Sequence, residues 1–190
     1  MVRISLLALL ACVPLACSSS TANPTDLPLR RGSIELHEAG SLKKGFLTKP
    51  VEMRGLKLSR WVQLYPDGSL HGGHLVADAD LAGVKIPADS HVWFDPEGHL
   101  DFAWFSKPVN FGQVTVAGGP VSKIETRFYP DGTLKTAFLR ADQVVQGVPC
   151  KASPENPVTF DEQGILVECT LSKKFNWEGQ ALSKGTLWRR

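Results

Sequence analysis

The sequence predicts an all-β protein, an antiparallel meander of about five hairpin-containing repeats. Three observations predict this fold: a glycine that recurs with leucine two residues later, apolar residues spaced by two before each glycine, and turn-forming residues between them. The chain has no long stretch of helical period and no alternation of strands with helices, so a parallel α/β sheet is not expected. The pattern leaves open whether the meander runs as an elongated array or curls into a barrel or sandwich.

The repeat is marked by glycines that stand about 30 residues apart, a period typical of solenoids, propellers and stacked hairpins. The glycine and leucine pairs are Gly40/Leu42, Gly68/Leu70, Gly98/Leu100, Gly132/Leu134 and Gly164/Leu166. Arrays of this kind usually serve as scaffolds or binding surfaces. The repeat therefore favours a binding role over catalysis.

The first strand of each unit lies just before the glycine, where residues four and six positions upstream are mostly apolar. These columns hold Leu36, Leu64, Phe94, Phe128 and Phe160, and Ile34, Val62, Val92, Thr126 and Val158. A spacing of two indicates a strand with one buried face. Segments such as 129–132 (YPDG) then predict a hairpin turn, with the glycine in the left-handed conformation.

The rest of each unit carries apolar columns two, seven, thirteen and eighteen residues after the glycine. Positions two and seven differ in parity, so either a β-bulge resets the register between them or both faces of the sheet are partly covered. The last two columns predict one further short strand in each unit. At the end of the chain, Trp177, Leu187 and Trp188 are expected to cap the final edge.

The N-terminal segment has the features of an export signal. Residues 1–16 place Arg3 before a short apolar run, and a cysteine after a small residue resembles the lipobox of bacterial lipoproteins. Both Cys12 and Cys17 fit the pattern, and the longer apolar run and following serines favour Cys17. An ordinary secretory signal is the alternative. Residues 17–33 are then a lipidated cysteine with a flexible spacer, and residues 34–190 are the β-hairpin repeat domain.

The lipoprotein resemblance implies that an N-terminal lipid holds the protein at a membrane. Because Ser18 follows Cys17, it also implies the outer membrane, on its periplasmic or surface face. A second resemblance lies in the repeat: segment 128–134 (FYPDGTL) resembles the aromatic–turn–glycine hairpins of MORN-type repeat proteins. That resemblance covers residues 34–190 and implies a binding or scaffold role, with no catalytic residues to carry over.

Charge and cysteine content narrow the class further. The formal net charge is only +2 and basic residues do not cluster, so nucleic acid is not an expected partner. Cys150 and Cys169 remain in the repeat domain, and in an exported protein such a pair suggests a disulfide. Both positions also fall in small or apolar columns. Two unbonded buried cysteines are therefore the alternative.

Residues that could carry other chemistry have simpler explanations. His71 and His74 have a spacing seen in metal sites, but residues three apart on a strand point to opposite faces. Turn acids could bind Ca²⁺, although turn propensity already accounts for them: Asp67, Asp95, Glu97 and Asp131. With no phosphate loop and no nucleophile motif, we expect no enzymatic activity, no cofactor and no metal. An envelope hydrolase would require acids from different units to meet in one cleft.

The best candidate site is a group of aromatic residues in the third unit, Trp93, Phe102 and Trp104. Trp93 alternates with the inward Val92 and Phe94, so it is expected on the outer face, where it could stack on a sugar or anchor a partner. A covering strand or loop is the alternative. The sequence thus predicts a non-enzymatic envelope lipoprotein presenting a β-repeat scaffold to a protein partner or cell-envelope polysaccharide. A periplasmic β-barrel that binds a small apolar ligand is the second interpretation.

Overall fold

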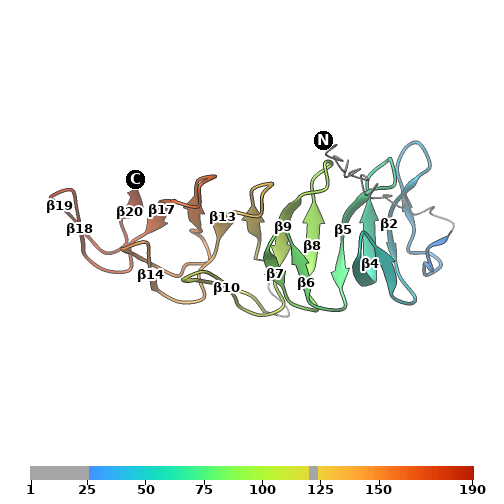
Figure 1. Cartoon of the computed structure of the whole chain (residues 1–190), viewed down its shortest axis with the longest axis horizontal. Helices are drawn as coiled ribbons and strands as arrows, with labels where there is room; N and C mark the ends of the chain where they lie inside the picture. Colours follow the sequence, from blue (N-terminus) through green and yellow to red (C-terminus); the bar gives the residue numbers. More distant parts are fainter. Residues whose placement is uncertain (1–25, 120–123) are drawn as a thin grey trace, which may run out of the picture.

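The computed structural model describes residues 26–119 and 124–190, which form an elongated all-β array (Figure 1). The strands of its main sheet pair antiparallel in chain order, from β1 at one edge to β20 at the other. The predicted all-β meander is confirmed. Because the two edge strands do not pair with each other, the sheet does not close into a barrel, and the barrel form of the second interpretation is wrong.

The path through the main sheet runs along the whole array. Its strands are β1 (Glu35–Leu36), β2 (Leu42–Phe46), β4 (Leu56–Leu64), β5 (Leu70–Leu75), β8 (His91–Phe94), β9 (Leu100–Trp104), β12 (Thr126–Phe128), β13 (Leu134–Ala137), β16 (Val158–Phe160), β17 (Leu166–Thr170) and β20 (Leu187–Arg189). The remaining strands form small hairpins between the main ones. They are β3 (Val51–Met53), which pairs with the start of β4, then β6 (Ala79–Leu81) with β7 (Val84–Ile86), β10 (Val109–Phe111) with β11 (Val114–Val116), β14 (Gln143–Val145) with β15 (Val148–Cys150), and β18 (Phe175–Trp177) with β19 (Gln180–Leu182).

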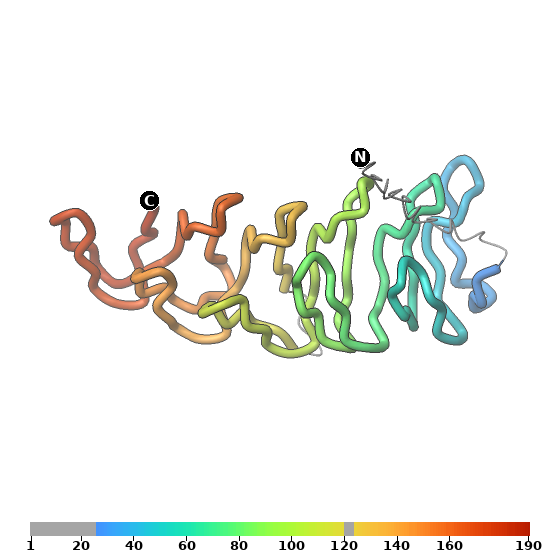
Figure 2. Tube along the Cα trace, in the orientation of Figure 1, coloured from blue at the N-terminus to red at the C-terminus, as the bar shows by residue number. Residues whose placement is uncertain are grey.

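The small hairpins correct one prediction: each unit was expected to add one further strand, but every unit after the first adds two, and the first adds β3, which pairs with the start of the long β4. The chain reverses between them at a two-residue turn. In the second unit this turn is Ala82–Gly83, with φ of 50° and 80°. Two successive left-handed residues close the tight hairpin whose twist matches that of the strands. Figure 2 traces the resulting path, which alternates between main and small hairpins along the long axis.

A β-bulge accounts for the parity problem in the second strand of each unit. Leu64 pairs with Leu70, whereas Gln63 pairs with Gly72, so His71 is an extra residue on β5. The extra residue shifts the alternation by one. Leu70 and Leu75 therefore point to the same face, and each is only 1% exposed. The same shift recurs in the other main hairpins, so the bulge was the correct alternative.

The hydrophobic core lies between the inner face of the main sheet and the small hairpins. Val62 and Val92 of the sheet are completely buried, and so are Ile86 and Val116 of the small hairpins. Isolated bridges join the two layers, for example between Val116 and Leu139. Each small hairpin thus covers apolar surface that a lone main hairpin would leave in water.

The two ends of the array differ from the interior. Ile34 and Leu36 were placed in buried columns, but they are 50% and 57% exposed because β1 is the edge strand of the described sheet. At the other edge, Trp188 is 1% exposed and meets Trp177 edge-on, with ring centroids 5.1 Å apart. The two tryptophans form the predicted cap. Leu187 does not contribute to it, since it is 43% exposed.

The N-terminal spacer is shorter than predicted. Leu27 and Leu29 pack against the core, Leu29 forms a bridge with Leu47, and the Arg30 amide donates to the Phe46 carbonyl at 2.8 Å. The prediction of a flexible spacer over residues 17–33 is therefore wrong from Leu27 onward. Residues 1–25, with the proposed signal peptide and both candidate acylation sites, Cys12 and Cys17, lie outside the described residues. In the described part of the chain, no helix has the length and apolar character to cross a membrane.

Candidate functional site

The outer face of the sheet carries the aromatic residues that the sequence singled out. Val92 and Phe94, which flank Trp93 on β8, are 0% and 3% exposed and point into the core. Trp93 lies between them on the opposite face and is half-buried. Phe102 and Trp104 on the neighbouring β9 lie on that face too, since Phe102 is the cross-strand partner of Trp93. The structure therefore brings the three predicted residues together.

Trp93 is the centre of a row of aromatic rings that runs across the strands, in which it stacks on Phe102 and is tilted by 39° from Trp61. Its ring lies 4.5 Å from Phe102 with an interplanar angle of 12°, and 5.4 Å from Trp61 of β4. A cation covers each end of the row: Lys44 Nζ lies 5.7 Å from the Trp61 ring, and the Arg127 guanidinium 5.0 Å from Phe102. We call these five residues the aromatic stack.

A glycine makes room for the aromatic stack. Strand β5 lies between β4 and β8, and Gly72 is its residue opposite Trp93. A Cβ at Gly72 would lie 2.8 Å from Trp93 Cδ1 and 2.9 Å from the Val92 carbonyl oxygen. The equivalent position holds a side chain in every other unit: Lys44, Phe102, Thr136 and Glu168. Gly72 thus lets the indole lie close to β5.

A second row of rings runs beside the stack. Trp61 Nε1 donates to His91 Nδ1 at 3.0 Å, and the His91 ring lies 5.9 Å from Trp104 and 4.9 Å from His74. Burial, the neighbouring His74 and then Arg60 lower the pKa of His91 to about 4. Above that pH His91 is neutral, which is the state in which Nδ1 can accept the Trp61 hydrogen bond.

This depressed pKa predicts a pH-dependent stability. Between pH 6.5 and pH 4 the unfolded chain binds a proton at His91 that the folded chain does not, so stability is complete above about pH 6.5 and falls as the pH drops toward 4. We expect a loss of about 1 to 2 kcal/mol across this window, allowing for solvent screening. Urea unfolding at a series of pH values measures it. His91→Gln keeps an acceptor but does not titrate, and an unchanged slope in this variant would contradict the assignment.

A serine, a histidine and an aspartate also meet beside the second row. Ser59 Oγ lies 3.1 Å from His74 Nδ1, but His74 Nε2 is 3.7 Å from Asp89 Oδ1, beyond hydrogen-bond distance. A catalytic triad needs that second hydrogen bond to orient the imidazole and stabilise its charged form. His74 is also only 1% exposed, and Asp89 lies close to Arg60. We assign no nucleophile here.

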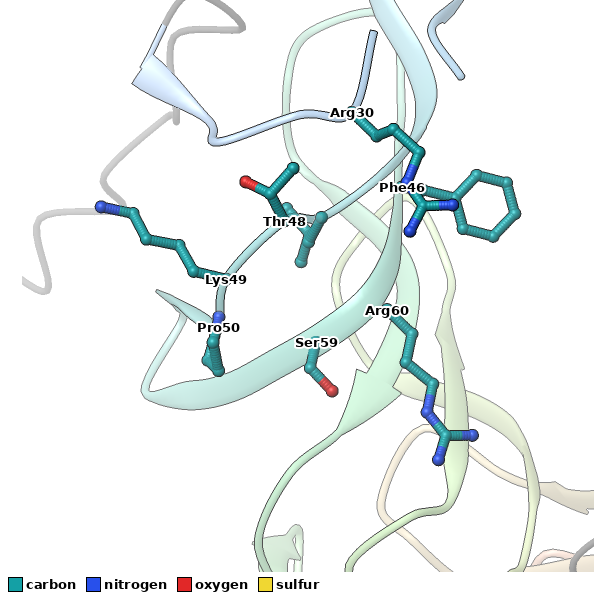
Figure 3. Close-up of a pocket in the computed structure, with 8 residues that line it drawn as sticks. Arg30, Phe46, Thr48, Lys49, Pro50, Ser59 and Arg60 are labelled. Atoms are coloured by element: carbon teal, nitrogen blue, oxygen red, sulfur yellow. The ribbon is translucent and has the colours of Figure 1, made fainter. Parts of the chain in front are cut away.

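A cavity of about 380 Å³ adjoins the end of the second row (Figure 3). It is lined by Arg30, Phe46, Leu47, Thr48, Lys49, Pro50, Ser59 and Arg60. Figure 3 shows the side chains of Lys49 and Arg60 pointing apart, so their charges do not converge on one anion. Phe46 is 46% exposed and is the cross-strand partner of Trp61. The residue of this region that bears on the aromatic stack is therefore Phe46, because it places an exposed ring on β2 beside Trp61.

Metal binding finds no support in the local geometry. His71 stacks on Tyr65 at 4.4 Å, whereas His74 belongs to the second row. Among the turn acids, Asp67 accepts a hydrogen bond from the Ser69 amide and Asp131 accepts one from the Thr133 amide, each at 2.9 Å. These hydrogen bonds are typical of turn-forming aspartates. Within residues 26–119 and 124–190, no three His, Cys, Asp or Glu side chains gather where they could hold a metal ion.

The sequence reasoning missed two residues of this face, Trp61 and Phe46. Both had a detectable signal: Trp61 alternates with the inward Val62 just as Trp93 does with Val92, and Phe46 occupies the same repeat position as Trp104. Comparison with known proteins adds no further guide, because the chain matches no family model, no curated protein and no solved structure.

Proposed function

We propose that this protein is a non-enzymatic, lipid-anchored protein of the bacterial envelope that binds a protein partner or a cell-envelope polysaccharide through the aromatic stack. The single observation that carries the proposal is the concentration of half-buried aromatic side chains on the outer face of the second and third units. In the later units the equivalents of Trp93 and Phe102 are all polar, namely Arg127, Thr159, Thr136 and Glu168, and only Phe138, the equivalent of Trp104, is aromatic. The core of the fold does not need these rings.

The surroundings of the stack support a preformed binding surface. Its rings are held by cross-strand neighbours, by Gly72 and by the hydrogen bond from Trp61 to His91. A surface that is already ordered loses little conformational entropy when a partner binds. The lipobox-like segment at Cys17 and the disulfide of Cys150 with Cys169 fit a protein that is exported and held at a membrane.

Trp93→Ala should reduce binding of the full chain to isolated cell envelopes by at least tenfold, since truncating a central aromatic anchor commonly costs about 2 kcal/mol. Co-sedimentation with envelopes measures the change, and far-UV circular dichroism checks that the fold is kept. Val144→Ala is the matched control, because Val144 is 54% exposed but lies on the small hairpin β14–β15. Equal binding by the Trp93 variant and the native protein would reject this surface.

A further inference from the structure

We infer that the ligand is an uncharged polysaccharide chain that lies across the strands, over the aromatic stack and the neighbouring Phe46 of β2. This inference rests on the proposed function and narrows it to one class of ligand. It depends on three features of the face: its length, its balance of charge, and the polar groups beside the rings.

The aromatic surface has the shape that a linear polymer requires. It crosses β2, β4, β5, β8 and β9, which are successive neighbours in the sheet. At a strand spacing of about 4.8 Å this is a span of about 20 Å. Trp61, Trp93 and Phe102 follow one another along that line, with centroids 5.4 Å and 4.5 Å apart, and Phe46 is the cross-strand partner of Trp61 at the β2 end. A row of rings that crosses several strands suits a ligand built from repeated units.

The charges on this face are largely cancelled. Arg127 pairs with Glu125 at 2.7 Å and with Asp101 at 3.5 Å, and Arg60 lies 3.9 Å from Asp89. Lys44 is the remaining cation of the stack, and its ammonium group lies against the Trp61 ring. A polyanion would find little net positive charge to bind. An uncharged polymer would leave the existing ion pairs undisturbed.

Polar groups flank the rings where hydroxyl groups of a sugar would meet them. Gln63 is the neighbour of Gly72 in the same outer row, and Asp101 is the extra bulge residue between Leu100 and Phe102. Both are half-buried. Sugars combine apolar ring faces with hydroxyl edges, so they match rings bordered by amide and carboxylate groups. A protein partner would instead be expected to insert anchors into a pocket.

The test uses the full chain and isolated envelopes treated either with proteinase K or with sodium periodate, which cleaves the vicinal diols of sugars. The polysaccharide released from the envelopes is then divided by anion exchange into neutral and acidic fractions. Binding of each fraction is measured by affinity electrophoresis. Trp61→Ala and Trp93→Ala report on the stack, and Val144→Ala is the control.

We expect binding to survive proteinase K and to be lost after periodate. The neutral fraction should retard the native protein, with little change between about 0.05 and 0.5 M salt. Trp61→Ala and Trp93→Ala should each weaken that binding by about tenfold or more. Loss of binding after proteinase K, or binding confined to the acidic fraction, would overturn the inference of an uncharged polysaccharide. If that binding still depended on Trp93, the proposed function would stand. Envelope binding that ignores both tryptophans would overturn the two together.

Discussion

Replacing Cys150 with valine and Cys169 with alanine should lower the free energy of unfolding by about 3 kcal/mol. The two residues are bonded and completely buried, with Cα atoms 5.7 Å apart and a sequence separation of 19. A crosslink over a loop of this size restricts the unfolded chain, and that restriction is lost in the variant. Valine and alanine occupy the equivalent positions of other units, as Val116 and Ala137, so the substitutions should not leave a large cavity.

Equilibrium unfolding in urea, read by tryptophan fluorescence, measures the effect. The native protein treated with a reducing agent in the denaturant is the internal control, because its unfolded chain also lacks the crosslink. Both samples should show a lower unfolding midpoint than the oxidised protein. If the double variant unfolds at the same urea concentration as the oxidised protein, the disulfide does not contribute to stability.

The disulfide joins two repeat positions that, in other units, are in contact only through side-chain packing. In the first units, Leu58 of β4 lies over Gly73 of β5, where a Cβ would be 3.1 Å from its methyl carbons. Cys150 and Cys169 hold the same two repeat positions between the fourth and fifth units. A large side chain over a glycine is thus replaced by two small side chains joined covalently. The sequence columns predicted small or apolar residues at both positions, and the pairing satisfies that requirement.

The main hairpins could be predicted from sequence because their signals are local. The leucine two residues after each glycine, and the proline before three of the five glycines, are read directly from the chain, and Leu70 and Leu75 are buried as expected. The small hairpins were missed because their turns use an unusual residue. Arg54, Ala82, Gln146 and Glu178 each adopt a positive φ before glycine, a conformation that side chains with a Cβ rarely take. The usual asparagine or aspartate signal of such a turn is absent there.

The aromatic face was only partly predictable for a related reason. Alternation along one strand showed that Trp93 points outward, and the structure places it there. Its contact with Trp61 depends on the register across β5, which is set by the two extra residues of β4, Arg60 and Trp61, and by the missing side chain of Gly72. Neither is visible from a single strand. The cross-strand neighbours that form the stack can be deduced only when the positions of the bulges are known.

Gly132→Ala should be as damaging as loss of the disulfide, with a decrease of about 3 kcal/mol in the free energy of unfolding. Two costs combine. Gly132 has a φ of 88°, which disfavours any residue with a Cβ, and the new Cβ would lie 2.5 Å from the carbonyl oxygen of Ala82. Ala82 is in the turn between β6 and β7, and Gly132 is in the turn between β12 and β13. The clash would therefore push apart two turns that are in contact in the native protein.

Gly40→Ala separates these two costs. Gly40 occupies the same repeat position with a φ of 84°, but nothing lies within 4 Å of the place that a Cβ would take there. It should lose only the backbone contribution of about 1 to 2 kcal/mol. The difference between the two variants, measured by urea unfolding, therefore reports the contact between Ala82 and Gly132. Similar contacts recur elsewhere, since Arg54 Nη2 donates to the Gly98 carbonyl at 3.1 Å. Equal losses in both variants would mean that the small hairpins do not brace the main turns, and that the array is held together by its core alone.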